Sequence, residues 1–120
     1  MFDKEPRIVV KFGYMWNTIQ FTYSGNGEVV TVPENFQSDG ATLNGFTKLF
    51  FSTREFLLGS EAAVVHDYMT KNKSEFDRRA SSVILKEIWV EAGLNPIKGE
   101  ILCLFTDLYQ CLLYRNEWKS

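Results

Sequence analysis

The first third of the chain alternates apolar and polar residues in short runs, which is the pattern of β-strands. Such runs cover residues 7–12, 18–23 and 28–32. Residues 24–27, between the last two runs, tolerate positive φ, so these runs should pair as a hairpin. Pro33 ends the third run, because proline has no N–H for a strand ladder. In the second run, Ile19, Phe21 and Tyr23 share one face that we expect to pack on helices.

The second half of the chain changes to a period of three to four residues, which predicts helices. These helical stretches lie at residues 61–72, 74–92 and from 95 onward. Ser60 and Ser74 stand at N-cap positions, and Asp77 follows Ser74 in an arrangement like a capping box. We therefore expect a structural role for Asp77. Gly93 ends the second helix, and Pro96 occupies the first turn of the third.

Apolar stripes on the second and third helices are most simply interpreted as core. On the third helix the stripe consists of Ile101, Leu104, Phe105, Leu108 and Leu112. Together the elements predict an α+β fold, with a small N-terminal antiparallel sheet of about three strands followed by three packed helices. A length of 120 residues fits a single domain spanning residues 1–120.

The two patterned regions are joined by a loop and an aromatic segment. Residues 34–45 are rich in turn-forming types, and Asp39 with Gly40 is either a simple turn or part of a functional loop. Residues 46–58 should form short helical turns that cap the core. Exposed aromatic side chains there would mark a surface for a partner. The candidates for such partner binding are Phe46, Phe50, Phe51 and Phe56.

Composition narrows the class of protein. The chain is 45% hydrophobic and 15% aromatic, which predicts a packed core, and its net charge of -2 gives no general attraction to nucleic acid. Cys103 and Cys111 lie about 12 Å apart along one predicted helix, beyond disulfide reach, so we expect reduced thiols. We expect no transmembrane segment and no secretion through a signal peptide, which favours a soluble protein of a reducing compartment.

The only histidine, His66, directly precedes Asp67 on the first predicted helix. A functional interpretation is a general base beside a carboxylate that holds a metal or the imidazole. The alternative is a half-buried histidine bonded to a carbonyl, next to an exposed aspartate. With one histidine and two distant cysteines, a His/Cys zinc site is excluded within one chain. The remaining catalytic hypothesis is a site for Ca²⁺ or another hard divalent cation, held by Asp39 and Asp67, with His66 activating water.

Residues 32–42 read VPENFQSDGAT and residues 62–68 read AAVVHDY. These two separated motifs resemble a family found in bacteriophages and prophages, domain of unknown function 1353. The family pattern is Val-Pro-x-Gly-Phe-x-Thr-Asp-x-Ala-Ser, followed by Ala-Ala-x-x-His-Asp-x-x-Tyr. The resemblance covers residues 28–110. It implies a phage origin, a soluble domain located in the host cytoplasm or the virion, and site positions at Asp39, His66 and Asp67, without implying an activity.

The His-Asp segment is also similar to the catalytic helix of secreted phospholipases. In those enzymes the histidine is the base, the following aspartate binds calcium, and an aspartate on a second helix orients the histidine. Thr70 stands here where that pattern has tyrosine, and Ser81 stands near the position of the orienting aspartate. Loss of the orienting carboxylate removes the group that fixes the tautomer of the imidazole.

These observations support two functions of different classes. The first is a non-catalytic phage protein, associated with the virion or tail or directed at a host protein, in which the aromatic segment or the terminal helix contacts a phage structural or host protein. The second is a metal-dependent hydrolase of an ester or cell-envelope substrate, with His66 as base. A small inhibitor of host defence is a third possibility that the sequence neither supports nor excludes.

Overall fold

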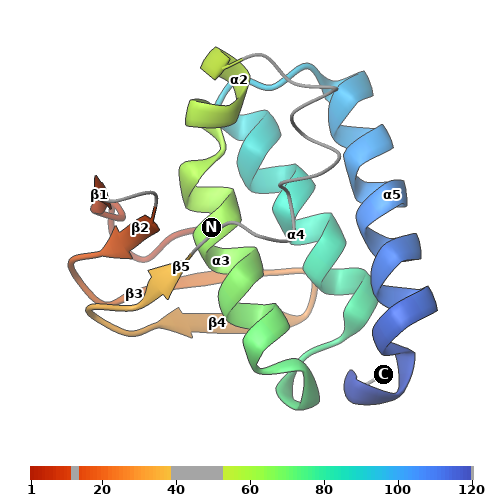
Figure 1. Ribbon diagram of the computed structural model, residues 1–120. Helices are drawn as coiled ribbons and strands as arrows, with labels where there is room; N and C mark the ends of the chain where they lie inside the picture. The colour runs from red at the N-terminus through yellow and green to blue at the C-terminus, as the bar shows by residue number, and fades with distance from the viewer. Residues whose placement is uncertain (12–13, 39–52, 120) are drawn as a thin grey trace.

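The computed structural model describes residues 1–11, 14–38 and 53–119 and confirms the α+β class. Short antiparallel strands from the first third of the chain pack beside three long helices (Figure 1). Helix α3 lies between the strands and α4, and α5 packs on α4 at the edge of the helical layer that lies farthest from the strands (Figure 1). The central position of α3 places the His66–Asp67 pair inside the molecule.

The strands form two small sheets. One has the order β1-β2-β5 and the other is the β3–β4 pair, both antiparallel. The strands are β1 Ile8–Lys11, β2 Tyr14–Asn17, β3 Phe21–Gly25, β4 Glu28–Val32 and β5 Gln37–Ser38. Strand β2 was not predicted, and β5 lies in the predicted loop. Both owe their extended conformation to pairing across the chain, because Met15 pairs with Ser38 and Trp16 with Gln37.

The predicted hairpin is confirmed at β3–β4. Gly25 pairs with Glu28, which leaves Asn26 and Gly27 as a two-residue turn with φ values of 52° and 77°. Positive φ at both positions gives a turn whose twist matches the strands. Phe21 and Tyr23 face the core, as their spacing predicts. Ile19, predicted on the same face, lies before the strand and is only partly buried, because β3 begins at Phe21. The strand ends before Pro33, also as predicted.

Three of the helices are long, and the start of α5 and the end of α4 follow local signals. The N-cap predicted at Ser60 was wrong, because Ser60 is the first residue of α3 and Gly59 holds the N-cap position. Asn95 caps α5 by accepting a hydrogen bond from Ile97 N at 2.8 Å, and Gly93 has a φ of 122° just after α4. The start predicted for α4 was wrong, because Ser74 lies in a separate 3₁₀ turn and Asp77 itself is the N-cap, accepting from Ala80 N at 2.9 Å. The helices are α2 Thr53–Leu58, α3 Ser60–Lys71, α4 Arg78–Glu91 and α5 Pro96–Tyr114, with 3₁₀ turns at η2 Lys73–Glu75 and η3 Arg115–Glu117.

Two glycines allow close packing between helices. A side chain at Gly59, where α2 meets α3, would overlap the indole ring of Trp89, which is fully buried and donates to Glu55 O at 2.9 Å. A Cβ at Gly99 would lie 2.7 Å from Cγ2 of Val90, so α5 approaches α4 as closely as it does because residue 99 has no side chain.

The prediction that the apolar stripe of α5 belongs to the core was wrong. All five of its residues are exposed, and the buried face of α5 consists instead of small, polar and few apolar residues. These inward residues are Gly99, Leu102, Cys103, Thr106 and Gln110. The stripe on α4 was assigned correctly, since Ile84, Ile88 and Trp89 are buried. The periodicity located an apolar face on each helix but could not tell which side of α5 meets the domain.

Candidate functional site

The His66–Asp67 pair lies on a helix that is buried on nearly all sides. Helix α3 contacts β2, β4 and β5 on one side and α4 on the other. His66 is 1% exposed and Asp67 5% exposed. The expectation of a half-buried histidine beside an exposed aspartate was therefore wrong, because His66 is fully buried and Asp67 is buried as well.

The imidazole of His66 is held neutral by its surroundings. Burial lowers its pKa to about 4, and the positive charge of Lys73 adds to the effect. Its Nε2 atom is buried and has no hydrogen-bond partner among the described residues. A base must contact the proton that it removes, and this ring is closed off from solvent in the conformation seen here.

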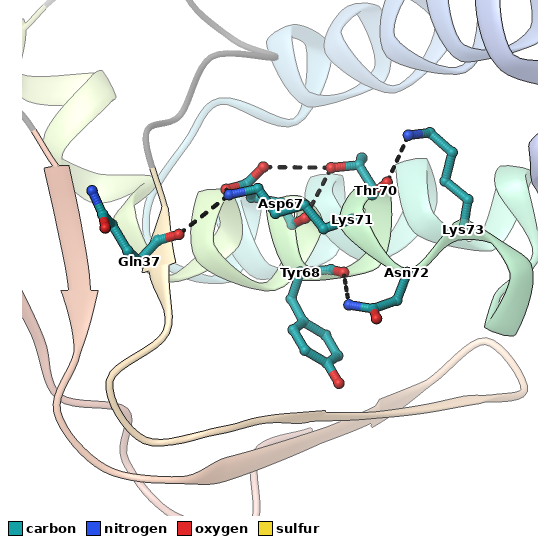
Figure 2. Close-up of polar contacts among 7 residues, drawn as sticks. All are labelled: Gln37, Asp67, Tyr68, Thr70, Lys71, Asn72 and Lys73. Carbon is teal, nitrogen blue, oxygen red and sulfur yellow. Dashed lines mark hydrogen bonds and ion pairs between the residues drawn. The ribbon is translucent and has the colours of Figure 1, made fainter.

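The carboxylate of Asp67 interacts with its own helix. The hydroxyl of Thr70 donates to Oδ1 of Asp67 at 3.4 Å and to the carbonyl of residue 67 at 2.9 Å (Figure 2). Oδ2 of Asp67 lies 3.4 Å from Lys71 Nζ, an ion pair without hydrogen-bond geometry. The carboxylate is thus incompletely hydrogen-bonded, although it is buried.

Lys71 connects α3 to the edge of the larger sheet. Its ammonium group donates to Gln37 O of β5 at 3.3 Å (Figure 2) and lies 5.3 Å from the centre of the Phe36 ring. With Asp67 on its other side, this cation ties the end of α3 to β5. A divalent cation at Asp67 would compete with Lys71 for the same oxygen.

The described residues do not complete a metal site. Among residues 1–11, 14–38 and 53–119, no three His, Cys, Asp or Glu side chains lie close enough together to share a metal ion. Asp39, the second predicted ligand, lies outside the described residues. The structure therefore leaves the ligand role of Asp39 and Asp67 as a prediction.

At residue 81, α4 has a serine and therefore no carboxylate that could orient His66. Ser81 is fully buried, and its hydroxyl donates to Arg78 O at 2.6 Å. Asp77 caps α4, which confirms the structural role predicted for it. The neighbouring Ser82 hydroxyl is buried without a hydrogen-bond partner among the described residues.

The aromatic residues predicted to bind a partner are not placed by the structure. Phe46, Phe50 and Phe51 lie outside the described residues, and Phe56 falls within α2. The terminal helix, also a candidate partner surface, is placed. The outer face of α5, defined here as Ile97, Ile101, Leu104, Phe105, Leu108, Tyr109, Leu112 and Leu113, has residue exposures between 39% and 71%.

The charged residues of α5 all lie where they pair with other helices. Lys98 Nζ is 2.9 Å from Glu55 Oε1 of α2, Glu100 Oε1 is 2.8 Å from Lys86 Nζ of α4, and Asp107 Oδ1 is 3.3 Å from Arg78 Nε of α4. These three are the only Asp, Glu, Lys or Arg residues of α5, all of which the structure describes. The outer face is consequently free of charge along the whole helix.

Fold and site together define a small α+β protein with a buried His-Asp helix and an apolar terminal helix. The model for the protein family of unknown function DUF1353 matches residues 16–104, and the chain belongs to that family. No curated protein and no solved structure matches the chain. Within the described residues, no helix is both long and apolar enough to cross a membrane.

Proposed function

We propose that this protein is a bacteriophage-encoded binding module without catalytic activity, which acts in the virion or tail or on a host protein. Its binding surface is the outer face of α5. The phage origin rests on the resemblance of the two sequence motifs to a phage and prophage family. The observation that carries the proposal is the exposure of apolar side chains along α5.

The size of this face supports binding. With roughly 200 Å² for a fully exposed side chain of this kind, the observed exposures correspond to about 900 Å² of apolar-residue surface. The largest apolar patch on an ordinary monomer is about 300 to 600 Å², and larger patches mark interaction sites. Leaving Leu104 and Leu112 in water at 65% and 71% exposure forgoes burial free energy that a partner would recover.

The state of His66 also favours a role without catalysis. The ring is buried, neutral at pH 7, and without a carboxylate from α4 at the position of Ser81. A buried histidine of this kind fills space between helices and need not touch a substrate.

A capture experiment tests this proposal. The tagged chain would be incubated with lysate of phage-infected host cells, and bound phage and host proteins identified by mass spectrometry. The matched variants are Leu104→Glu with Leu108→Glu on α5 and Val29→Glu, an equally exposed apolar residue on β4. We expect specific capture by the wild type, by Val29→Glu and by His66→Gln, and loss of capture with the α5 variant. Capture that ignores the α5 substitutions, or no specific capture at all, would refute the proposal.

A metal-dependent hydrolase is the second candidate, because two adjacent residues each have a buried polar atom without a hydrogen-bond partner in the described part of the chain. These are Nε2 of His66 and Oδ2 of Asp67, on adjacent residues of α3. Calorimetric titration with Ca²⁺ and with Zn²⁺ tests this function. Binding that is lost in both Asp39→Asn and Asp67→Asn would support the hydrolase, and heats unchanged by either substitution would exclude the predicted site.

A further inference from the structure

We infer that the outer face of α5 binds the same face of a second copy of this chain, with the two α5 helices antiparallel about a twofold axis. This inference rests on the proposed function, since it names the partner of that binding surface. The homodimer would then meet other phage or host proteins through its remaining surfaces, and substitutions on α5 would abolish their capture by breaking the dimer. Three features of α5 support it: its area, the order of its residues, and the placement of its charges.

The exposed area is that of a stable dimer interface. Two outer faces of about 900 Å² each, if fully covered, would bury about 1,800 Å² in total. Stable and specific interfaces bury about 1,200 to 2,000 Å². One copy of α5 therefore supplies half of a complete interface without help from other elements.

The apolar positions of α5 are arranged as a twofold axis requires. In a symmetric interface each residue must find its counterpart on the same patch of the partner. Reversing α5 about the midpoint between residues 104 and 105 maps six of its eight outward positions onto one another. The pairs are Ile97 with Leu112, Ile101 with Leu108, and Leu104 with Phe105. All six of these positions are apolar, whereas Tyr109 and Leu113 fall opposite Glu100 and Pro96.

The spacing of these positions also suits helix pairing. Steps of four, three, four and four residues connect Ile97, Ile101, Leu104, Leu108 and Leu112, which keeps them in one stripe about 22 Å long. Two antiparallel helices can pack the side-chain rows of such stripes between one another. The regular spacing of these side chains suits a helical partner better than a flat surface without a helix.

The charges of α5 favour a protein partner over a lipid surface. Helices that lie on membranes carry Lys and Arg at the border of the apolar face, where they meet anionic headgroups. The only cation of α5 is Lys98, and it is engaged by Glu55. Thr106 and Gln110 of α5 are buried against the domain, and the charged side chain of α5 that is most exposed, at 62%, is the anion Glu100.

Light scattering coupled to gel filtration tests the dimer. Chain concentrations from about 1 to about 100 µM cover the range in which an interface of this area should associate. We expect twice the 13.9 kDa mass of one chain for the wild type and for Val29→Glu. Leu104→Glu with Leu108→Glu should give a monomer with an unchanged circular dichroism spectrum, since both residues are exposed. A monomeric wild type at all concentrations would overturn the inference.

Crosslinking tests the orientation in a background of Cys103→Ala and Cys111→Ala. Leu104→Cys lies beside the twofold axis and should oxidise to a disulfide-linked dimer. Leu112→Cys should not, because its two copies would be about 22 Å apart along the axis. A mixture of the Leu112→Cys and Ile97→Cys chains should crosslink. Self-crosslinking of Leu112→Cys as complete as that of Leu104→Cys would refute the antiparallel arrangement.

The failures of the two proposals can be told apart. A monomer that loses capture of other proteins on α5 substitution would overturn the dimer and keep the binding function. A dimer that captures no phage or host protein would keep the dimer and overturn the proposed binding function. A monomer that sediments with phosphatidylcholine and phosphatidylglycerol vesicles through α5 would overturn the dimer and replace it with a lipid surface.

Discussion

Acid should destabilise this protein through the buried His66. Its pKa is about 4 in the folded chain against 6.5 for the free side chain, because burial and the charge of Lys73 oppose protonation. Between these values the unfolded chain binds a proton that the folded chain does not bind. The free energy of unfolding therefore falls as the pH is lowered from about 6.5 to about 4 and is unaffected by this group at higher pH.

The expected effect is large for a domain of this size. The difference between the two pKa values corresponds to a loss of about 3 kcal/mol in the free energy of unfolding. Most of this loss is reached by about pH 4.5. Small domains have total stabilities of about 5 to 15 kcal/mol. A single imidazole would thus remove a sizeable share of the stability over this interval.

Urea unfolding at a series of pH values, followed by circular dichroism, measures this effect. Carboxylates also titrate in acid, so the comparison is between the wild type and His66→Gln, which cannot be protonated. We expect the wild type to lose about 2 to 3 kcal/mol more than His66→Gln between about pH 7.5 and 4.5. Val65→Ala, another buried change on α3, controls for lowered stability and should keep the pH dependence of the wild type. Parallel pH profiles for the wild type and His66→Gln would refute the reasoning.

Three further predictions concern packing and the hairpin. Gly59→Ala should destabilise by about 1 to 3 kcal/mol, because the new methyl overlaps a buried indole; urea midpoints measure this, and an unchanged midpoint would contradict it. Leu102→Ala on the inner side of α5 should lower the free energy of unfolding by about 2 to 5 kcal/mol. Leu108→Ala on the outer face should change the stability of the monomer by less than about 0.5 kcal/mol. Urea unfolding of both variants in the Leu104→Glu background tests this difference. Tyr23 has a pKa raised to about 12, by burial first and then by the charges of two α4 carboxylates, one of them Glu87, whose Oε2 lies 3.3 Å from the tyrosine hydroxyl. Glu87→Gln should lower that pKa, as followed by NMR titration of the ring, and a pKa that stays near 12 would show that burial alone accounts for the shift.

Local signals in the sequence predicted much of this fold. The Asn26–Gly27 turn, Pro96 in the first turn of α5 and the end of α4 at Gly93 each depend on residues within one turn of the chain, so they can be identified without a tertiary structure. The N-caps predicted at Ser60 and Ser74 were wrong, since Gly59 and Asp77 hold those positions. Strands β2 and β5 could not be identified in this way. Their extended conformation comes from pairing between Trp16 and Gln37, about twenty residues apart.

The candidate site was predicted only in part. Adjacency on a helix placed His66 and Asp67 together, but their burial depends on α4 and the strands, which no local pattern encodes. For α5, the stripe was found and assigned to the wrong side. A usable signal was present, because Gly99 and the pairable charges of Lys98 and Glu100 mark the side that faces α4 and α2.

Gly99 controls the shape of a surface that it does not touch. Because Gly99 has no side chain, the first turn of α5 lies close against Val90 of α4. A methyl group there would push that end of α5 outward and leave its far end in place. Ile97 would then move away from the domain while Leu112 kept its place, so the row of apolar residues would tilt relative to α4. The position of the outer apolar row of α5 therefore depends on the absence of a side chain at Gly99.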